Sequence, residues 1–470
     1  MTGEGAGRMM EHVRNTVRRL PTWERVRQAV LHRRSRAVGS LLTGTAATAA
    51  ISLVSVAVTA RALGPASYGI LALILTLGQA SERLLSFQSW QPLIRYGATL
   101  NAEADRADLR SLFKFGLLLD LAGGATAWAA ASILSLAAHW VTGLPLRMAG
   151  LALIYMTSLL FTVNGVSTAI FRLYGHFHTM ARIQIANALV RLALVMIAIS
   201  YGAGLRGFVI LWAITQIQGS LTNFAAACVI LRTKARITGL LRAPVRGISD
   251  RFPGLWRFTW GANAALTLSS SVQQIDTLIV GWLASPASAG LYHIAKRVSR
   301  VIQQVGSQVE AVIYPELSRM AAQGQRKALV RVVLQTEILL AIYGAACVAA
   351  LLLTGERLLS WTAGPAFAAA APLLTVQVFA VSLGISGAAS RAALLALGKQ
   401  PAVMRTVMMA TAGFYLAAPP LVTVIGAMGA NIAHVVFAAI WLTGLSLSLR
   451  RTLRHWPAPR EGALAVAGQR

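Results

Sequence analysis

Leu63–Gly69 reads LGPASYG, and Ala284–Gly290 reads ASPASAG. Both stretches contain Pro-Ala-Ser-x-Gly, and each separates two long apolar runs. A turn accounts for one copy, because proline fixes φ and glycine adopts conformations closed to other residues. Two copies raise the question of whether other residues recur at the same distance.

Further turn and loop residues recur in the same order and at nearly the same spacing as the two prolines, Pro65 and Pro286. The other matching pairs are Pro92 with Pro315, Arg95 with Arg319, Gly175 with Gly398 and Arg182 with Arg405. The stretch 201–207 (YGAGLRG) also corresponds loosely to 425–430 (IGAMGA). The sequence therefore predicts a duplicated chain. An even number of helices in each half returns the chain to the same side of a membrane, which makes the two repeats parallel.

The composition indicates a membrane protein. Of the 470 residues 56% are hydrophobic and 12% are charged, and the mean hydropathy is +0.62. Soluble domains usually carry about 25% charged residues. We predict an all-α integral membrane protein of twelve helices in two six-helix bundles with a central cationic cavity. The predicted helices are 38–60, 68–92, 112–137, 147–171, 180–201, 207–231, 257–283, 289–315, 329–353, 368–396, 402–424 and 429–450.

The basic residues give the orientation. Most of the 43 Lys and Arg residues fall in the tails and in alternate loops, whereas the other loops hold Arg61, Arg147, Arg206 and Arg357. This asymmetry predicts a multi-pass protein of the cytoplasmic (inner) membrane with both termini in the cytoplasm. The net charge of +28 is therefore explained by topology rather than by nucleic-acid binding. The two cysteines lie in apolar runs, which argues against a disulfide framework or a metal site.

The predicted division of the chain follows from these spans. It consists of a basic cytoplasmic segment (1–37), a first bundle (38–232), a basic cytoplasmic linker (233–256), a second bundle (257–450) and a cytoplasmic tail (451–470). The first segment is either an amphipathic helix lying on anionic headgroups or a solvated tail that helps to orient the chain.

Polar residues on predicted helix 289–315 recur with helical period. They form one stripe of Lys296, Arg300, Gln303, Ser307 and Glu310, which Arg297, Gln304 and Gln308 widen. A charge at the centre of a spanning helix costs about 2.5–3.5 kcal/mol on insertion scales, so the stripe should face water or a partner. Predicted helix 68–92 has a similar polar stripe, formed by Thr76, Gln79, Glu82, Arg83 and Ser86. Predicted helix 257–283 carries Gln273 and Asp276. We expect these helices and helix 38–60 to line one shared polar cavity.

The candidate substrate-binding residues are Gln79, Arg83, Lys296, Arg297, Arg300, Gln303 and Gln304. Arginine suits phosphate, because its planar fork makes two charge-assisted hydrogen bonds. The alternative is that these charges pair with each other, for example Lys296 or Arg300 with Asp276. Asp276, Glu310 and Glu82 are candidates for coupling to H⁺ or Na⁺. The isolated charges Asp120, Arg191, Glu337 and Arg391 are expected to be structural. No catalytic residue, metal site or other cofactor is predicted.

Several motifs resemble a known family. They are ARALGPASYGILALI (60–74), QPLIRYGA (91–98), IDTLIVGWLASPASAGLYHIAKRVSRVI (275–302) and YPELSRMAAQG (314–324). Together they resemble the oligosaccharide flippases of the polysaccharide transporter family, within the multidrug/oligosaccharidyl-lipid/polysaccharide exporter (MOP) superfamily. The resemblance implies a two-lobed transporter that moves polyprenyl-pyrophosphate-linked oligosaccharide to the outer leaflet by alternating access. It also implies that Arg83, Lys296, Arg297 and Arg300 are cavity cations.

The partners expected from this interpretation are the lipid-linked oligosaccharide, membrane lipids and polysaccharide polymerases or glycosyltransferases. An antiporter of drugs or other small molecules in the same superfamily is the nearest alternative, although such pumps more often use acidic pockets. A membrane enzyme is disfavoured, because the predicted outer loops are short and the eight His residues form no cluster typical of a metal site. A non-transporting component of a glycan assembly complex is a third alternative.

Overall fold

The computed structural model describes residues 23–455 apart from 88, 101–104, 138–142 and 235, and it describes side chains from Gly44 onward except 262, 264–266 and 268–270. Most of the basic segment 1–37 and most of the tail 451–470 therefore lie outside the described residues. No strand occurs in the described ranges, and the chain is built from long helices. The all-α prediction is confirmed.

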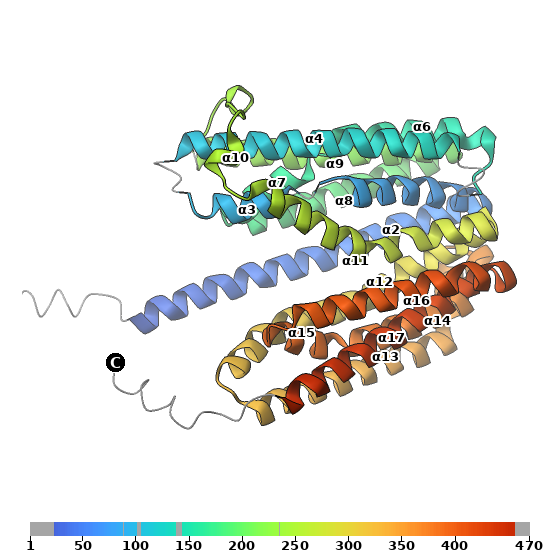
Figure 1. Cartoon of the computed structure of the whole chain (residues 1–470). Coiled ribbons are helices and arrows are strands. Elements are labelled where there is room, and N and C mark those ends of the chain that lie inside the picture. Colours follow the sequence, from blue (N-terminus) through green and yellow to red (C-terminus); the bar gives the residue numbers. More distant parts are fainter. Residues whose placement is uncertain (1–22, 88, 101–104, 138–142, 235, 456–470) are drawn as a thin grey trace, which may run out of the picture.

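The first group of helices comprises α2–α9, and we call it the N-lobe (Figure 1). Its elements are α2 (Trp23–Leu85), α3 (Trp90–Gly97), α4 (Arg106–Leu136), η1 (Leu146–Met148), α6 (Ala149–Met156), η2 (Thr157–Phe161), α7 (Asn164–Leu173), α8 (Phe177–Ser200) and α9 (Leu205–Thr233). Helix α2 holds the first two predicted spans, which are separated where Gly64 leaves the helical conformation at φ 70° and ψ 169°. A positive φ suits glycine because it has no Cβ.

The second group comprises α11–α17, and we call it the C-lobe. Its elements are α11 (Leu255–Leu283), α12 (Pro286–Ala322), α13 (Arg326–Thr362), η4 (Pro365–Ala370), α14 (Ala371–Ser386), α15 (Ala388–Ala396), α16 (Gln400–Ile425) and α17 (Ala427–Arg454). The linker between the lobes carries η3 (Leu240–Arg242) and the short helix α10 (Ile248–Arg251). Helix α12 begins with Ser285 as N-cap, whose Oγ accepts a hydrogen bond from the Ser288 N–H at 3.1 Å, and with Pro286 in the first turn.

Nine of the described stretches are long and apolar enough to cross a membrane. One of them, Gly44–Gly97, joins the first two predicted spans, and α11 and α12 are not in the set. These two helices are nevertheless long, and they carry the polar residues singled out above. Together the helices make up the twelve predicted spans of a multi-pass membrane protein.

A span that the sequence analysis predicted as continuous is broken at an equivalent position in each lobe. In predicted helix 147–171 the break falls at Thr162–Val163, and in predicted helix 368–396 it falls at Gly387, which occupies the equivalent position. In the N-lobe, Ser220 Oγ accepts from the Val163 N–H and Asp120 Oδ2 accepts from the Val166 N–H, both at 2.9 Å. These side chains stabilise the break, because a backbone N–H freed inside a membrane needs a partner.

The C-lobe break is held in a similar way. Ser390 Oγ donates to Glu337 Oε1 at 2.6 Å, so a carboxylate from the preceding span meets the break in both lobes. Asp120 and Glu337 are therefore structural, as expected. Predicted helix 68–92 is also interrupted, since α2 ends at Leu85 and α3 begins at Trp90. There Ser89 Oγ donates to Asp120 Oδ1 at 2.5 Å.

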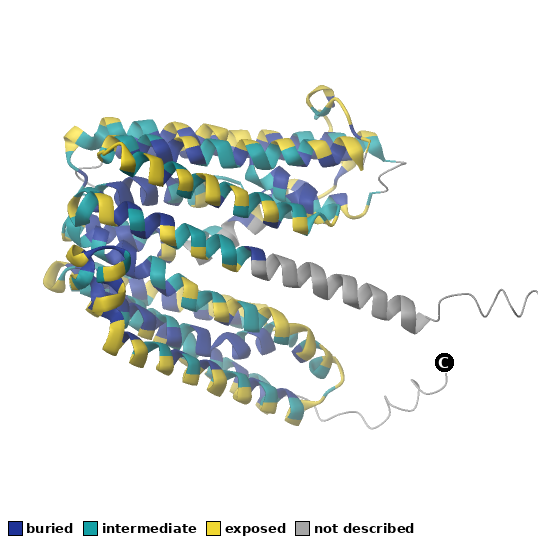
Figure 2. Ribbon diagram, turned by 180° about the vertical axis from the view of Figure 1, so that it is seen from behind, coloured by how far each residue is buried: buried dark blue, intermediate teal, exposed yellow. Residues whose placement is uncertain are grey.

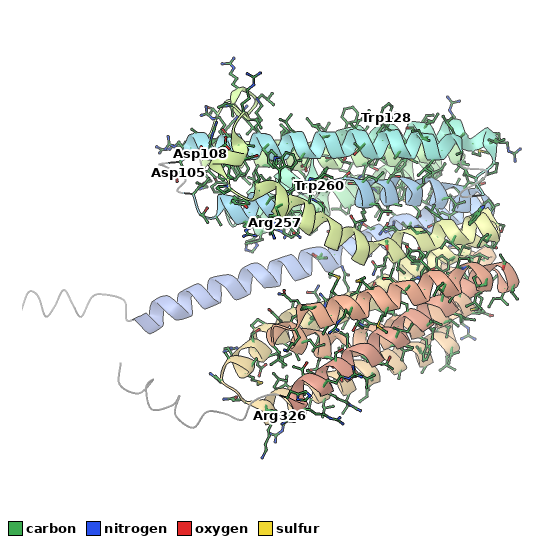
Figure 3. The ribbon with its side chains drawn as sticks, viewed as in Figure 1. Asp105, Asp108, Trp128, Arg257, Trp260 and Arg326 are labelled. Carbon is green, nitrogen blue, oxygen red and sulfur yellow. The ribbon has the colours of Figure 1, made fainter. Side chains whose placement is uncertain are left out.

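The two lobes meet at one end and diverge toward the other end, where α2 begins and α17 ends (Figure 1). We call the meeting end, which carries the turns at Gly64 and at Ala284–Ser285, the closed end. Buried residues gather there (Figure 2). The opposite end carries charged side chains, among them Asp105, Asp108, Arg257 and Arg326 (Figure 3).

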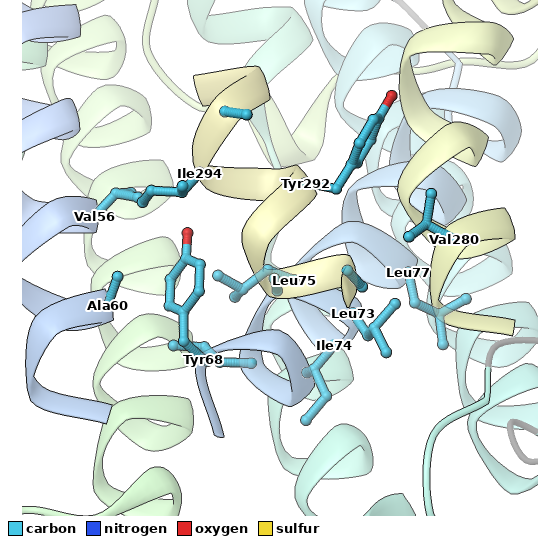
Figure 4. Close-up of a cluster of buried hydrophobic side chains, with 14 of the residues drawn as sticks. Val56, Ala60, Tyr68, Leu73, Ile74, Leu75, Leu77, Val280, Tyr292 and Ile294 are labelled. Carbon is cyan, nitrogen blue, oxygen red and sulfur yellow. The ribbon is translucent and has the colours of Figure 1, made fainter. Parts of the chain in front are cut away.

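The repeated Pro-Ala-Ser-x-Gly segments pack against each other at the closed end. A Cβ at Gly69 would overlap the carbonyl oxygen of Pro286, and a Cβ at Gly290 would lie 2.6 Å from the carbonyl oxygen of Pro65. The duplicated glycines therefore permit a close crossing of the two lobes, related by the internal repeat. Beside the crossing, the hydroxyl of Tyr68 lies 2.6 Å from His293 Nδ1, and both side chains are buried. Figure 4 shows Tyr68 and Ile294 from opposite lobes in the same apolar cluster.

Candidate functional site

The polar stripe of α12 lines a cavity inside the C-lobe. The cavity has a volume of about 490 Å³, and its walls come from α11, α12, α14, α15, α16 and α17. The stripe residues in its wall are Lys296, Arg300, Gln303, Ser307 and Glu310. We call this space the C-lobe cavity. The helical period of the stripe thus places five of its residues together.

Asp276 is the centre of a buried network at one edge of this cavity. Lys296 Nζ lies 2.5 Å from Asp276 Oδ1 and also donates to the Gln273 carbonyl at 2.6 Å. The Tyr292 hydroxyl donates to Asp276 Oδ2 at 2.8 Å, and His434 Nε2 lies 2.9 Å from the same oxygen. Asp276 is fully buried and Lys296 is 5% exposed. The pairing of Lys296 with Asp276, which the sequence left open, is therefore present, and the ammonium is already engaged.

A second ion pair crosses the C-lobe cavity. Arg391 lies 3.3 Å from Glu310, and both side chains line the space. Arg391 and Glu310 thus neutralise each other, as do Lys296 and Asp276. Within the described residues, Arg300 is the lining cation for which no carboxylate partner is found. The cavity therefore has an unbalanced positive charge at Arg300.

Two further arginines lie close enough to Arg300 to interact with it electrostatically. They are Arg297, one residue after Lys296 on α12, and Arg83 at the end of α2. Arg297 also interacts with Tyr68 and Tyr155 of the N-lobe, and its Nε is buried with no hydrogen-bond partner in the described part of the chain. We call Arg83, Arg297 and Arg300 the seam cations. They place like charges together in the region where the two lobes face each other, which we call the seam.

The remaining predicted residues lie near this seam but not in the C-lobe cavity. Gln79 interacts with the Tyr155 hydroxyl, and Glu82 interacts with Arg83 and with Asn164. Gln304 is half-buried on α12, and its backbone carbonyl accepts from Ser307 Oγ at 2.7 Å. Neither Gln304 nor Arg297 lines the C-lobe cavity.

The single shared cavity expected from the sequence stays a prediction; the described residues include two polar spaces, one in each lobe. The polar face of predicted helix 38–60 contributes Thr48 and Ser52 to a separate space inside the N-lobe, walled also by α7, α8 and α9. In the described part of the chain, polar residues thus line one space in each lobe. The sequence analysis also missed His434 and Gln377 in the C-lobe cavity. The available signal for both was a polar residue inside a largely apolar run.

Solved structures share this architecture. An inward-facing multidrug resistance MATE family transporter of the MOP superfamily matches with a TM-score of 0.68 and 16% identity, over 87% of this chain and 96% of that chain. Lipid II flippase MurJ in an inward closed conformation matches with a TM-score of 0.67 and 13% identity, over 87% of each chain. This chain therefore has the same fold as these two proteins.

Sequence comparison shows the family to which the chain belongs. Residues 58–372 match the family described as polysaccharide biosynthesis protein, and the chain belongs to that family. Inner membrane protein YghQ of Escherichia coli (strain K12) is 25% identical over 317 residues, which is 67% of this chain and 88% of that protein. The resemblance drawn from the sequence motifs is confirmed at the level of the family.

Proposed function

We propose that this transporter flips a polyprenyl-pyrophosphate-linked oligosaccharide from the cytoplasmic to the outer leaflet of the inner membrane. The observation that carries the proposal is the group of seam cations, whose charges exceed those of the nearby carboxylates. Clustered arginines inside a membrane are costly unless an anion is bound between them. A pyrophosphate supplies such an anion, and arginine binds phosphate oxygens through paired hydrogen bonds.

In this mechanism the bundles 38–232 and 257–450 rock against each other about the closed end. With both termini in the cytoplasm, the diverging end, where α2 begins and α17 ends, faces the cytoplasm. It admits the headgroup from that side while the polyprenyl tail stays in lipid. Separation at the closed end and approach at the other end then expose the headgroup outside. The charge of the seam cations favours this substrate over the cationic molecules of a drug antiporter.

Coupling to H⁺ or Na⁺ is part of the proposal. Each of the three candidate carboxylates has a basic neighbour. Glu82 interacts with Arg83, Glu310 pairs with Arg391, and Asp276 pairs with both Lys296 and His434. Glycosyltransferases that build the headgroup and a polymerase that uses it outside are the expected partners.

Replacing Arg300 by alanine should reduce glycan export at least about tenfold. Hydrogen bonds to a charged group are worth roughly 1.5–3 kcal/mol, and about 1.4 kcal/mol corresponds to a factor of ten. Arg300→Lys should retain part of the activity, because lysine keeps the charge but loses the planar fork. The measurement is the surface glycan of cells in which the protein is quantified in the membrane.

The matched control is Arg319→Ala, which removes an exposed arginine from the far end of the same helix. It should leave export unchanged. Undiminished export by Arg300→Ala at a normal membrane level would remove Arg300 from the proposed site.

A further inference from the structure

The space inside the N-lobe is lined by an unusual number of amide side chains. It has a volume of about 200 Å³, and we call it the N-lobe pocket. Five primary amides are in its wall, namely Asn164, Gln184, Asn187, Gln216 and Asn223. On α8 and α9 the polar residues recur with helical period, so each helix turns one polar stripe toward the pocket.

Several of these amides have free hydrogen-bonding capacity. Within the described part of the chain, the side chains of Gln184, Gln216 and Asn223 make no hydrogen bond with the protein. Asn187 Oδ1 accepts from Gln218 Nε2 at 2.9 Å, which fixes that amide against α9. Unpaired amides inside a helical bundle are costly, because each loses its hydrogen bonds to water. A polar ligand or water must therefore satisfy them.

The pocket does not have the chemistry of an ion site. Its described wall contains no carboxylate, and its one cation is Arg191. The Arg191 guanidinium lies over the Trp212 ring at 4.8 Å from the centroid, and its Nε donates to Thr215 Oγ1 at 3.2 Å. Arg191 is thus held against the wall, as expected for a structural charge. Neutral groups that both donate and accept remain free, and these match the hydroxyls of a sugar.

The broken span supports a ligand site here. Asn164 is the first residue of α7, directly after the break at Thr162–Val163, and Ser220, which holds the break, also lines the pocket. Irregular backbone at membrane depth is tolerated where it lines a cavity or is buried in protein. Asn164 also interacts with Glu82, which faces the seam cation Arg83. The pocket is therefore linked to the seam through this pair of side chains.

We propose that the N-lobe pocket is a subsite for uncharged sugar residues of the glycan headgroup, distinct from the cationic site for the pyrophosphate. The inference rests on the proposed function, because it assigns one part of that substrate to one part of the protein. Asn187 and Asn223 supply hydrogen bonds to sugar hydroxyls, and Gly219 leaves room between α8 and α9. A Cβ at Gly219 would lie 3.5 Å from Asn187 Nδ2, so the glycine is not required by the packing of the protein itself.

The test measures binding of two soluble probes to the purified full-length protein by calorimetry. One probe is farnesyl diphosphate, and the other is farnesyl diphosphate linked to cellobiose, a neutral disaccharide. The wild type should bind the glycosylated probe about tenfold more tightly, as one or two additional hydrogen bonds would provide. Asn187→Leu and Asn223→Leu should each abolish most of this gain and leave binding of farnesyl diphosphate within about twofold.

Two further variants keep the test independent of folding. Gly219→Val keeps every amide but fills the pocket, and it should also reduce the gain from the disaccharide. Gln323→Leu removes an exposed amide after the end of α12 and should change neither probe. A gain that survives in Asn187→Leu, Asn223→Leu and Gly219→Val would overturn the subsite, as would the absence of any gain in a wild type that binds farnesyl diphosphate. Failure of the wild type to bind either probe would instead overturn the proposed function.

Discussion

Replacing Asp276 by asparagine should lower the free energy of unfolding by about 3–5 kcal/mol, the usual cost of breaking a buried ion pair. Asparagine keeps the shape of the side chain and can still accept from Tyr292. It removes the negative charge that lies 2.5 Å from Lys296 Nζ. Lys296 is 5% exposed, so its ammonium would remain buried without a counter-charge.

Adding Lys296→Met to Asp276→Asn should recover most of the lost stability. Replacing both members of a buried pair by groups of similar volume is often neutral, because the desolvation cost of both charges disappears. Lys296→Met alone should cost less than Asp276→Asn, since Asp276 keeps His434 at 2.9 Å as a second basic partner. Comparing the unfolding free energies of the three variants therefore distinguishes the contribution of the Asp276–Lys296 pair from that of the other contacts of Asp276.

The measurement is thermal unfolding of the purified protein in one detergent, followed by the fluorescence of its 11 tryptophans. For a chain of 470 residues, a loss of 3–5 kcal/mol corresponds to a fall in Tm of about 3–5 °C. Glu310→Gln is the matched control, because the Arg391 side chain opposite is 42% exposed and such a pair contributes about 0–1 kcal/mol. Equal melting of Asp276→Asn and wild type would show that the pair does not stabilise the C-lobe.

The same variants bear on the substrate assignment of Lys296. A stable Asp276→Asn, Lys296→Met protein that still exports glycan would exclude Lys296 from pyrophosphate binding and leave that role to the seam cations. A stable double variant that does not export glycan would support a role for this pair in transport, either Lys296 as a substrate ligand or Asp276 as a coupling group. Membrane levels must be equal for either comparison.

The repeat and the number of spans could be predicted from the sequence, because both depend on local features. Turn prolines and glycines mark the ends of apolar runs, and the runs have the length of a bilayer. The paired glycines Gly175 and Gly398 illustrate this, since their φ values of 69° and 70° lie in the left-handed region that favours glycine. The stripe on α12 was predictable for the same reason, since its period belongs to a single helix.

The broken spans and the cavity partners could not be predicted, because they depend on contacts between distant segments. The break at Thr162–Val163 contains no proline or glycine, and it is held by Ser220 and Asp120 from other helices. His434 and Gln377 lie in apolar runs that hold few other polar residues, so the period of the run does not show which side they face. The pairing of Asp276 with Lys296 rather than with Arg300 was likewise decided only by the packing of α11 against α12.

Replacing Gly69 or Gly290 by alanine should force the lobes apart at the closed end. The new methyl group at Gly69 would overlap the backbone of Pro286 and that at Gly290 the backbone near Pro65, and a backbone carbonyl cannot rotate away as a side chain can. Overpacking of this kind costs about 1–3 kcal/mol and can cost more. The neighbouring hydrogen bond between Tyr68 and His293 should be lost with the crossing, so the closed arrangement is destabilised relative to an arrangement open at this end.

Spin labels at Ala62 and Ala366, exposed positions on opposite lobes at the closed end, can report the separation. Cys228 and Cys347 are first replaced by alanine, so that only the introduced cysteines carry labels. Each glycine variant should lengthen or broaden the distance distribution compared with the parent protein. The matched control is Gly150→Ala in α6, where no atom outside the local helix lies within 4 Å of the added Cβ and helix propensity predicts a gain of roughly 0.5–1 kcal/mol.

The double variant Gly69→Ala, Gly290→Ala is the strongest form of this experiment. The two methyl groups would lie at the same crossing, so the separation caused by one of them also makes room for the other. The effect of the second substitution should therefore be smaller than that of the first. Two independent sites would instead give additive effects. Unchanged label distances in all three variants would mean that this crossing does not hold the lobes together, and alternating access would then need a different point of contact at the closed end.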